Sequence, residues 1–241
     1  MPERSLIRTG AVCAIAGGVL AAVGNGLHPR YVNQDNVQML RTVARFGRWE
    51  GVHALLLVAI ALVVTGLAVL ALTLTGERDR RLCRFALWSV LAGGAVAFVS
   101  IGIDGFGVRA MARELVAARP ENQAAAFYGA RSAVLLSFAT FATFVIVLLG
   151  VAPVLLGLGM AWSDRYPSWL GWLGLVGGLA SLAVGFAMGL RGDTDTNTYL
   201  FAAASALDTI WVIAAGVFMW RVAERAPRPV PAEAAMVETA A

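Results

Sequence analysis

Two residues that could perform acid/base chemistry, Glu50 and His53, stand three positions apart where an apolar run begins. A carboxylate and an imidazole at this spacing share one face of a helix, where both could exchange protons with a bound molecule. The preceding Trp49 would add an aromatic surface beside them. We therefore predict that Glu50 is catalytic and that His53 and Trp49 bind a substrate.

Two further acids, Asp104 and Asp208, belong to other apolar runs. Charge inside a membrane is costly, so each acid is a candidate functional group. If Arg84 lies at one membrane surface, a rise of about 1.5 Å per residue places Asp104 roughly 30 Å away, near the opposite boundary. The same count from Arg221 places Asp208 roughly 20 Å from that first surface, in the far half of the membrane. Both acids would approach the level at which the Glu50 helix begins.

The sequence therefore predicts one polar site at a single depth, assembled from several helices. His28 ends the first apolar run at this level, and two arginines flank it. The candidate catalytic residues are Asp208, Glu50 and Asp104, and the candidate substrate-binding residues are His53, Arg109, Arg131, Trp49 and Trp211.

Asp208 is the leading candidate because its neighbours in the sequence are apolar. Without a partner, such a carboxyl would stay protonated and could serve as a general acid. The alternative is a structural ion pair with Arg109 or Arg131. Glu50 and Asp104 have a simpler alternative, as interfacial residues solvated by lipid headgroups.

The Glu50-x-x-His53 spacing is also used by metal-binding helical bundles. A two-metal site of that kind needs a second such motif, and the sequence has none. A site for one ion would have to recruit Asp104, Asp208 or His28. We therefore assign no metal ligands and no cofactor at this stage.

The composition indicates which solvent surrounds these residues. Of 241 residues, 59% are hydrophobic and only 14% are charged, and the mean hydropathy is +0.73. Soluble proteins carry about 25% charged residues, so the deficit indicates a membrane protein. The net charge of +4 comes from arginines in the loops, a pattern that does not predict nucleic-acid binding.

Six apolar runs approach the roughly 20 residues that span a bilayer. We therefore predict an all-α polytopic membrane protein with about six transmembrane helices in one bundle. The domain would cover residues 1–222, and residues 223–241 would form a disordered tail. The runs are approximately Ala11–Leu27, Gly51–Leu74, Phe85–Ile103, Ala133–Trp162, Trp169–Leu190 and Tyr199–Trp220.

The connections have patterns of their own. Between Pro29 and Arg48, a capping box at Asp35 and Gln38 precedes apolar residues at helical spacing, which predicts an amphipathic helix on the membrane surface. The alternative there is an ordinary solvated loop. The third helix should continue to Arg119 and form, with the fourth, a helical hairpin that extends outside the membrane.

Several features predict placement and packing. Arginine clusters in a short loop (Arg78, Arg80, Arg81 and Arg84), which favours a cytoplasmic position for that loop and for both termini. Pro153 should kink the fourth helix. The fifth helix is rich in glycine, which suits close helix packing and suggests a possible homodimer through this helix.

From the fourth helix onward, the chain resembles a bacterial family of six-helix membrane proteins of unknown function. The resemblance rests on the segment from Pro167 to Gly174, on Leu207-Asp208 with Trp211 and Gly216, and on Trp220-Arg221. It implies a multi-pass protein of the bacterial cytoplasmic membrane.

Trp49-Glu50 and Leu207-Asp208 are also similar to motifs of small membrane-bound terpene cyclases of meroterpenoid pathways. That resemblance implies that the two acids protonate an epoxide or an alkene and guide a carbocation. The cyclases have seven helices, whereas six are predicted here.

Together these patterns predict acid/base catalysis, by cyclisation or isomerisation, on a lipophilic small molecule such as a terpenoid. Membrane lipids and that molecule are the expected partners, and nucleic acid is not. Two alternatives remain: a proton-coupled transporter or exporter, and a non-catalytic membrane partner subunit whose acids form ion pairs.

Overall fold

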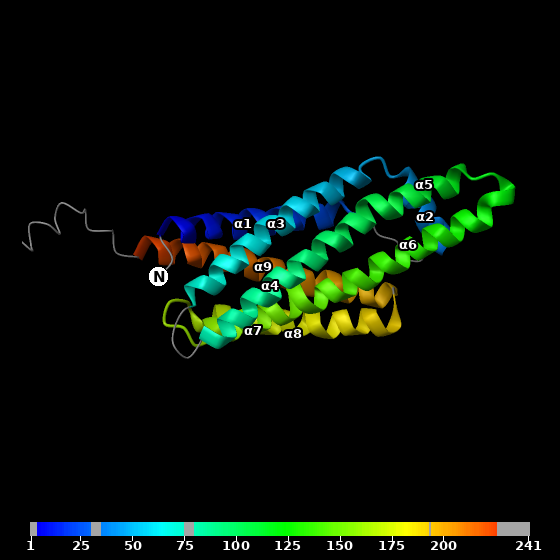
Figure 1. Ribbon diagram of the computed structural model, residues 1–241. Coiled ribbons are helices and arrows are strands. Elements are labelled where there is room, and N and C mark those ends of the chain that lie inside the picture. Colours follow the sequence, from blue (N-terminus) through cyan, green and yellow to red (C-terminus); the bar gives the residue numbers. More distant parts are fainter. Residues whose placement is uncertain (1–3, 30–34, 75–79, 193, 226–241) are drawn as a thin grey trace, which may run out of the picture.

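The structure is a computed structural model that describes residues 4–29, 35–74, 80–192 and 194–225. The described residues are almost entirely helical and form no strand. Figure 1 shows long helices lying side by side along a common direction. In chain order the elements are α1 (Arg4–Leu27), α2 (Asn36–Arg45), α3 (Trp49–Thr73), α4 (Arg80–Gly102), η1 (Ile103–Val108), α5 (Arg109–Ala117), η2 (Pro120–Asn122), α6 (Gln123–Phe144), η3 (Val145–Val151), α7 (Ala152–Ala161), α8 (Ser168–Arg191) and α9 (Asp195–Arg225).

Six of the helical stretches are long and apolar enough to cross a membrane. They correspond one for one to the six predicted runs, so the predicted fold class, an all-α polytopic membrane protein, is confirmed. The spans are α1, α3, the continuous α4–η1–α5 stretch, the continuous η2–α6–η3–α7 stretch, α8 and α9.

Small residues hold the spans close together. A methyl group on Gly66 of α3 would lie 2.7 Å from the Ala14 backbone nitrogen of α1. A methyl group on Gly157 of α7 would likewise lie 2.6 Å from the Gly171 carbonyl oxygen of α8. Such close approach is how helices associate in lipid, where apolar burial between helices gives little advantage.

The glycine-rich surface of α8 is used inside the chain. Gly171, Gly174, Gly177, Gly178 and Gly185 are all buried against neighbouring helices. The homodimer that these glycines suggested stays a prediction, since their packing is accounted for within one protomer.

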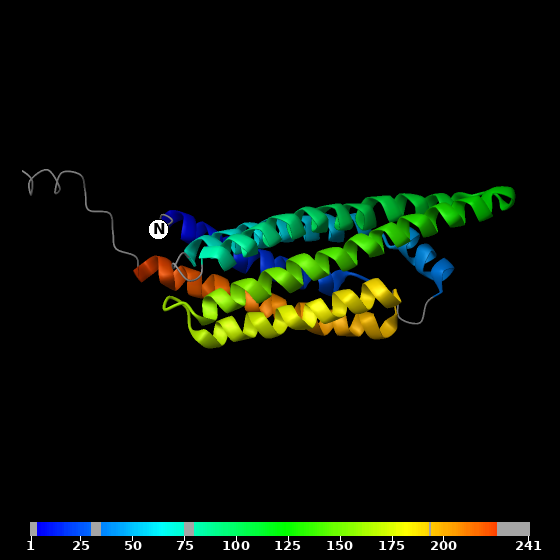
Figure 2. The ribbon, with the colours of Figure 1, turned by 60° about the horizontal axis from the view of Figure 1, so that its bottom comes forward.

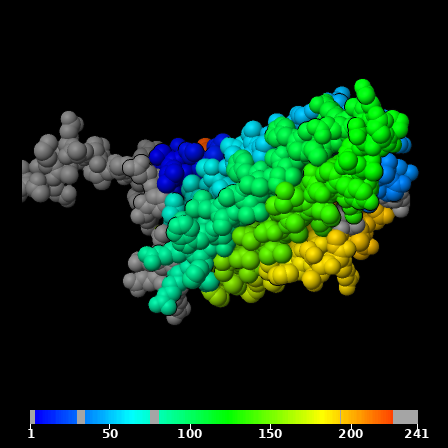
Figure 3. Space-filling view, turned by 45° about the vertical axis from the view of Figure 1, so that its right-hand side comes forward, coloured from blue at the N-terminus to red at the C-terminus, as the bar shows by residue number. Residues whose placement is uncertain are grey.

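The hairpin predicted between the third and fourth spans is present. α5 and the beginning of α6 extend past the ends of α8 and α9, as Figures 1 and 2 both show. In the space-filling view the hairpin and α2 lie at the same end of the molecule (Figure 3).

α2 is present with its capping box, since the Asp35 side chain accepts from the Gln38 backbone and Gln38 reciprocates. Its apolar residues Leu40 and Val43 are buried against Trp49 and the helical hairpin. The predicted helix is therefore present, and the ordinary solvated loop is not what the structure shows. Part of its apolar face packs against the protein itself, and its position on the membrane surface stays a prediction.

Two π-helical stretches interrupt the long spans. η3 directly precedes α7, in which Pro153 lacks a backbone donor, so the irregularity expected at this proline takes the form of a wider turn. η1 contains Asp104 and has no proline within it. π-Helical turns are rare and often occur at functional sites.

The two ends of the bundle differ. The first described residues of α1 and the last of α9 lie at one end, and the hairpin and α2 lie at the other (Figure 1). α9 continues to Arg225, three residues beyond the predicted domain boundary, and the rest of the predicted tail lies outside the described residues. Arg78 also falls outside them, and the predicted cytoplasmic termini stay a prediction.

Candidate functional site

His28, His53 and Asp104 come together at the hairpin end of the bundle, and we call them the histidine–aspartate cluster. His28 follows the last residue of α1, His53 lies one turn into α3, and Asp104 lies in η1. Nε2 of His53 is 3.0 Å from Oδ2 of Asp104, and Nε2 of His28 is 3.9 Å from the same oxygen. Three spans thus deliver one chemical group each to a single point.

Both imidazoles are oriented by backbone carbonyl groups. Nδ1 of His53 lies 2.8 Å from the Trp49 carbonyl oxygen, and Nδ1 of His28 lies 2.9 Å from that of Pro29. A carbonyl oxygen can only accept, so each Nδ1 carries a hydrogen and donates it. Both rings therefore turn their Nε2 atoms toward the Asp104 carboxylate.

Trp49 forms the aromatic wall of the cluster. Its ring centroid is 4.5 Å from that of His53 and 5.1 Å from that of His28. Its indole nitrogen donates to the Asp104 carbonyl oxygen at 3.1 Å, which ties α3 to η1. Trp49 is itself buried, so it positions the three side chains around it.

Gly105 allows η1 to approach His53. A methyl group at this position would lie 2.4 Å from Cβ of His53, closer than two carbon atoms can come. The neighbouring Asp104 side chain is about one-third exposed, whereas that of His53 is almost fully buried. The cluster is therefore fixed on one side and accessible on the other.

A second ionic group lies beside the cluster. Glu50 pairs with Arg109 at 2.7 Å and with Arg113 at 3.0 Å. Arg109 is buried and also donates to the carbonyl oxygens of Val43 and Phe46 at the end of α2. This group fastens the hairpin to α2 and to the start of α3.

Arg131, a predicted substrate-binding residue, belongs to α6 and donates to the Asn36 side chain at the first turn of α2. It therefore contributes to the attachment of α2. Its predicted role in substrate binding stays a prediction.

Asp208 lies in different surroundings. Its Oδ2 accepts a hydrogen bond of 2.5 Å from the Ser181 hydroxyl of α8, and a methyl group on Gly177 would lie 2.6 Å from its Oδ1. The residue is 3% exposed. Oδ1 has no hydrogen-bond partner among the described residues. The alternative that pairs Asp208 with Arg109 or Arg131 is not what the structure shows, since both arginines bind other groups.

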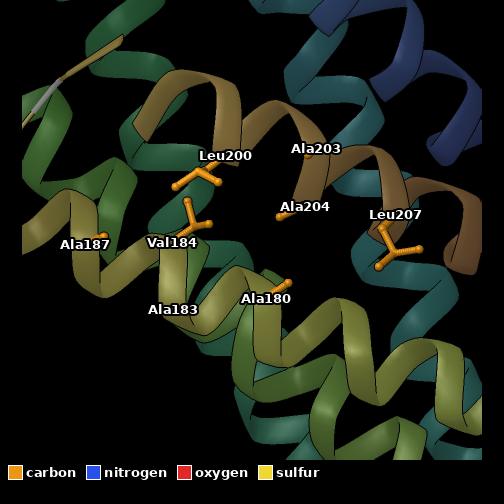
Figure 4. A pocket seen from close by; sticks show the side chains of 8 residues that line it. All are labelled: Ala180, Ala183, Val184, Ala187, Leu200, Ala203, Ala204 and Leu207. Atoms are coloured by element: carbon orange, nitrogen blue, oxygen red, sulfur yellow. The ribbon is translucent and has the colours of Figure 1, made fainter. Parts of the chain in front are cut away.

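Trp211 lies one turn beyond Asp208 and is fully buried. Its indole nitrogen donates to the Leu170 carbonyl oxygen at 3.1 Å, which joins α9 to α8. The groove that opens between these two helices, about 420 Å³ in volume, is lined by Val184, Leu200, Leu207 and alanines, and neither Asp208 nor Trp211 lines it (Figure 4).

The predicted convergence is thus resolved into separate groups. Asp104 and His53 meet as expected, Glu50 turns to Arg109, and the partners described for Asp208 lie on α8. His28 was predicted to lie at this depth and was weighed as a ligand for a single ion, but it was not among the predicted catalytic or substrate-binding residues.

Comparison with known proteins gives one match. A protein-family model described as a domain of unknown function (DUF4386) matches residues 9–221. Searches of curated proteins and of solved structures find no match. The comparisons therefore show no terpene cyclase similarity.

Proposed function

Since this chain belongs to the DUF4386 family, a domain of unknown function, we propose its function from the geometry of the site itself. It is a membrane-embedded enzyme that transfers protons to or from a lipophilic substrate at the histidine–aspartate cluster. The observation that carries the proposal is the 3.0 Å contact between His53 Nε2 and Asp104 Oδ2, with the opposite edge of the imidazole held by a backbone carbonyl group.

An imidazole fixed in one tautomer beside a carboxylate is suited to general acid/base catalysis. The proton moves at the edge where Nε2 of His53 and Oδ2 of Asp104 meet, and the carboxylate stabilises positive charge on the ring. The Asp104 side chain is about one-third exposed, and in this proposal a substrate reaches the edge from that side. Trp49 keeps the other side of both imidazoles apolar.

The position of the cluster indicates the class of substrate. The cluster lies where three apolar spans end or change helix type, so a molecule that dissolves in the membrane reaches it with its polar end. Cyclisation or isomerisation of a terpenoid is one reaction of this kind. A lipid whose hydrolysis begins with proton removal from water is another.

Glu50 takes a positioning role in this proposal. Its carboxylate faces Arg109 and Arg113 rather than the cluster, so it acts through the placement of α2 and the hairpin. The predicted catalytic role of Asp208 stays a prediction, because the helix contacts that enclose this side chain leave it almost no exposed surface.

Deuterium incorporation tests the proposal without knowledge of the substrate. The purified protein in lipid nanodiscs is incubated in D₂O with a bacterial membrane lipid extract, and lipids are analysed by mass spectrometry. We expect at least one lipid whose mass or deuterium content changes with wild-type protein and not with Asp104→Asn. Asp164→Asn, in the exposed loop at the other end, is the matched control and should match wild type.

Two results would count against this function. One is a lipid extract that wild-type protein leaves unchanged. The other is a change that Asp104→Asn produces as fast as wild type, which would place the chemistry elsewhere.

A second candidate function, proton-coupled transport, is favoured by one observation. The Asp208 carboxyl is buried between α8 and α9 and has an oxygen without a hydrogen-bond partner in the described part of the chain. Acids inside a membrane domain often carry protons. Proteoliposomes that contain the protein should then take up metabolites from a membrane extract only when a pH gradient is applied, and Asp208→Asn should abolish this uptake. Uptake at the same rate with and without the gradient would exclude this candidate.

A further inference from the structure

We infer that His28, His53 and Asp104 bind one divalent transition-metal ion, with Zn²⁺ the best match to the donor set. Their ligand atoms all lie within 4.8 Å of one another. The inference depends on the proposed function for what the ion does, and on geometry alone for the ion itself. It reverses the expectation from sequence that the protein has no metal ligands.

The positions of the imidazole hydrogens favour a cation between the rings and the carboxylate. Because each Nδ1 donates to a carbonyl oxygen, a neutral ring presents a lone pair at Nε2. At His53 this lone pair would face a carboxylate oxygen only 3.0 Å away. Two acceptors at that distance repel each other unless a cation lies between them, and the cation is either a proton or a metal ion.

The distances between the donor atoms suit a metal ion. Zn²⁺ binds histidine nitrogen and carboxylate oxygen at roughly 2.0–2.2 Å, so two donors on one ion lie roughly 3.0–3.5 Å apart. The His53 and Asp104 atoms already have this separation, and the His28 pair is slightly wider at 3.9 Å. A small movement of His28, whose side chain is about one-quarter exposed, closes the set.

The groups around the three donors hold them in place. Metal-binding histidines usually donate their other ring nitrogen to a carbonyl or carboxylate group, which fixes the ring for the ion. Both histidines here have that arrangement, with the carbonyl groups of Trp49 and Pro29 as acceptors. Gly105 and the Trp49 indole hold η1 against His53, so the carboxylate is fixed as well.

The donor set also indicates the kind of ion. Two imidazole nitrogens and one carboxylate oxygen suit Zn²⁺ and other first-row divalent ions better than Mg²⁺ or Ca²⁺, which prefer oxygen ligands. Three protein ligands leave a coordination position open, as catalytic zinc sites do. When bound, such an ion would lower the pKa of a water molecule in that position to about 7. The proposed proton transfer would then take place at this water molecule, with His53 and Asp104 holding the ion.

Metal analysis and a Co²⁺ titration test the inference directly. Purified wild-type protein is stripped with chelator and titrated with Co²⁺, whose visible absorption reports histidine and carboxylate ligands, and Zn²⁺ then competes. We expect one ion per chain. Asp104→Asn and His28→Gln should weaken binding by at least the roughly 10–100-fold that loss of an outer-shell partner alone produces.

Asp208→Asn is the matched control, because it removes another buried carboxyl group that is not part of the cluster. It should bind Co²⁺ as wild type does. Helical content by circular dichroism shows that each variant is folded, and if His28→Gln does not fold, Asp104→Asn and the wild-type titration decide.

Two outcomes would overturn the inference: folded wild-type protein that takes up neither Co²⁺ nor Zn²⁺, or equal binding by wild type and Asp104→Asn. If no metal ion is taken up, the cation between His53 and Asp104 is a proton. An ion bound without lipid turnover would refute the proposed enzyme alone. Full turnover by the stripped protein, with Co²⁺ still bound by wild type, would refute only the ion's part in the chemistry.

Discussion

Asp104 and Asp208 are two acids in apolar spans of one bundle, yet they have opposite surroundings. Asp104 lies in a π-helical turn, faces two imidazoles and remains one-third exposed. Asp208 lies in regular helix, accepts from one serine and is 3% exposed. The position of an acid along the membrane normal therefore does not by itself indicate whether the acid could react. Its exposure and the groups that contact its carboxylate are needed as well.

The Ser181–Asp208 contact has a structural explanation. Hydrogen bonds between helices in membranes contribute about 0.6 kcal/mol on average, and up to about 2 kcal/mol in model peptides. Gly177 makes room for the Asp208 carboxyl on the α8 side. In this comparison Asp208 joins two helices, whereas Asp104 faces two imidazoles and stays partly exposed.

The largest expected effect is that of Asp104→Asn. Loss of a positioned acid/base group lowers turnover by about 10²–10⁴-fold, and the side-chain shape is kept. Rates of lipid conversion for Asp104→Asn and Asp208→Asn, each measured against wild type, check this. A greater loss in Asp208→Asn would reverse the comparison.

Next in size is Gly105→Ala. Its methyl group would overlap Cβ of His53, and overpacking of this kind costs about 1–3 kcal/mol. We expect lower thermal stability and at least tenfold weaker Co²⁺ binding, since about 1.4 kcal/mol corresponds to a factor of ten. Gly107→Ala in the same turn is the control, because its methyl group would meet only a side-chain carbon of Ile103, at 3.9 Å. Equal behaviour of the two variants would show that η1 is free to move away from His53.

Ser181→Ala tests the other acid. It removes the one described donor to Asp208. A hydrogen bond between membrane helices is worth about 0.6 kcal/mol on average and up to about 2 kcal/mol, so we expect a loss of stability of that size. Thermal unfolding in detergent should show this loss while metal content stays at the wild-type level. Ser205→Ala, whose hydroxyl bonds to its own helix at Ala202, is the control. Metal loss in Ser181→Ala would mean that the two acids are coupled.

The smallest expected effect is that of Glu50→Gln. Its side chain is 37% exposed, although that of its partner Arg109 is only 4% exposed. Glutamine keeps an oxygen that can accept from the guanidinium group, so the cost should stay near the roughly 0–1 kcal/mol of ion pairs that reach solvent. Arg109 keeps its hydrogen bonds to Val43 and Phe46. We expect a slight loss of stability by thermal unfolding and unchanged Co²⁺ binding. Loss of Co²⁺ binding in this variant would make Glu50 a member of the cluster.

The six spans, the hairpin and the capping box could be predicted from the sequence, because each follows from local pattern: apolar length, Pro120 and the Asp35–Gln38 pair. Counting residues along helices also predicted that Asp104 and His53 lie at one level. The rise per residue gives the position of a residue along the bundle axis, but it does not give the direction in which its side chain points. That is why Asp208 was placed with them although its partner is Ser181.

Other features depend on tertiary contacts that local pattern does not encode. An amphipathic stretch such as α2 predicts a covered face without saying whether lipid or protein covers it, and here the hairpin covers part of it. Glu50 and His53 are neighbours on one helix, yet the hairpin supplies arginines to one and η1 supplies a carboxylate to the other. The π-helical turn at Asp104 leaves no recognisable pattern in the residues that form it.

The docking of α2 has a consequence for chain entropy. His28 and His53 are 25 positions apart, and α2 lies in the segment that joins them. Ordering a residue costs about 1–2 kcal/mol of backbone entropy. If the connecting segment were ordered only when a ligand joined the two rings, this cost would weaken the binding of that ligand. Because Arg109 and the capping box already fix α2, folding bears that cost in advance for residues 36–45, and a ligand of the cluster does not have to order this helix.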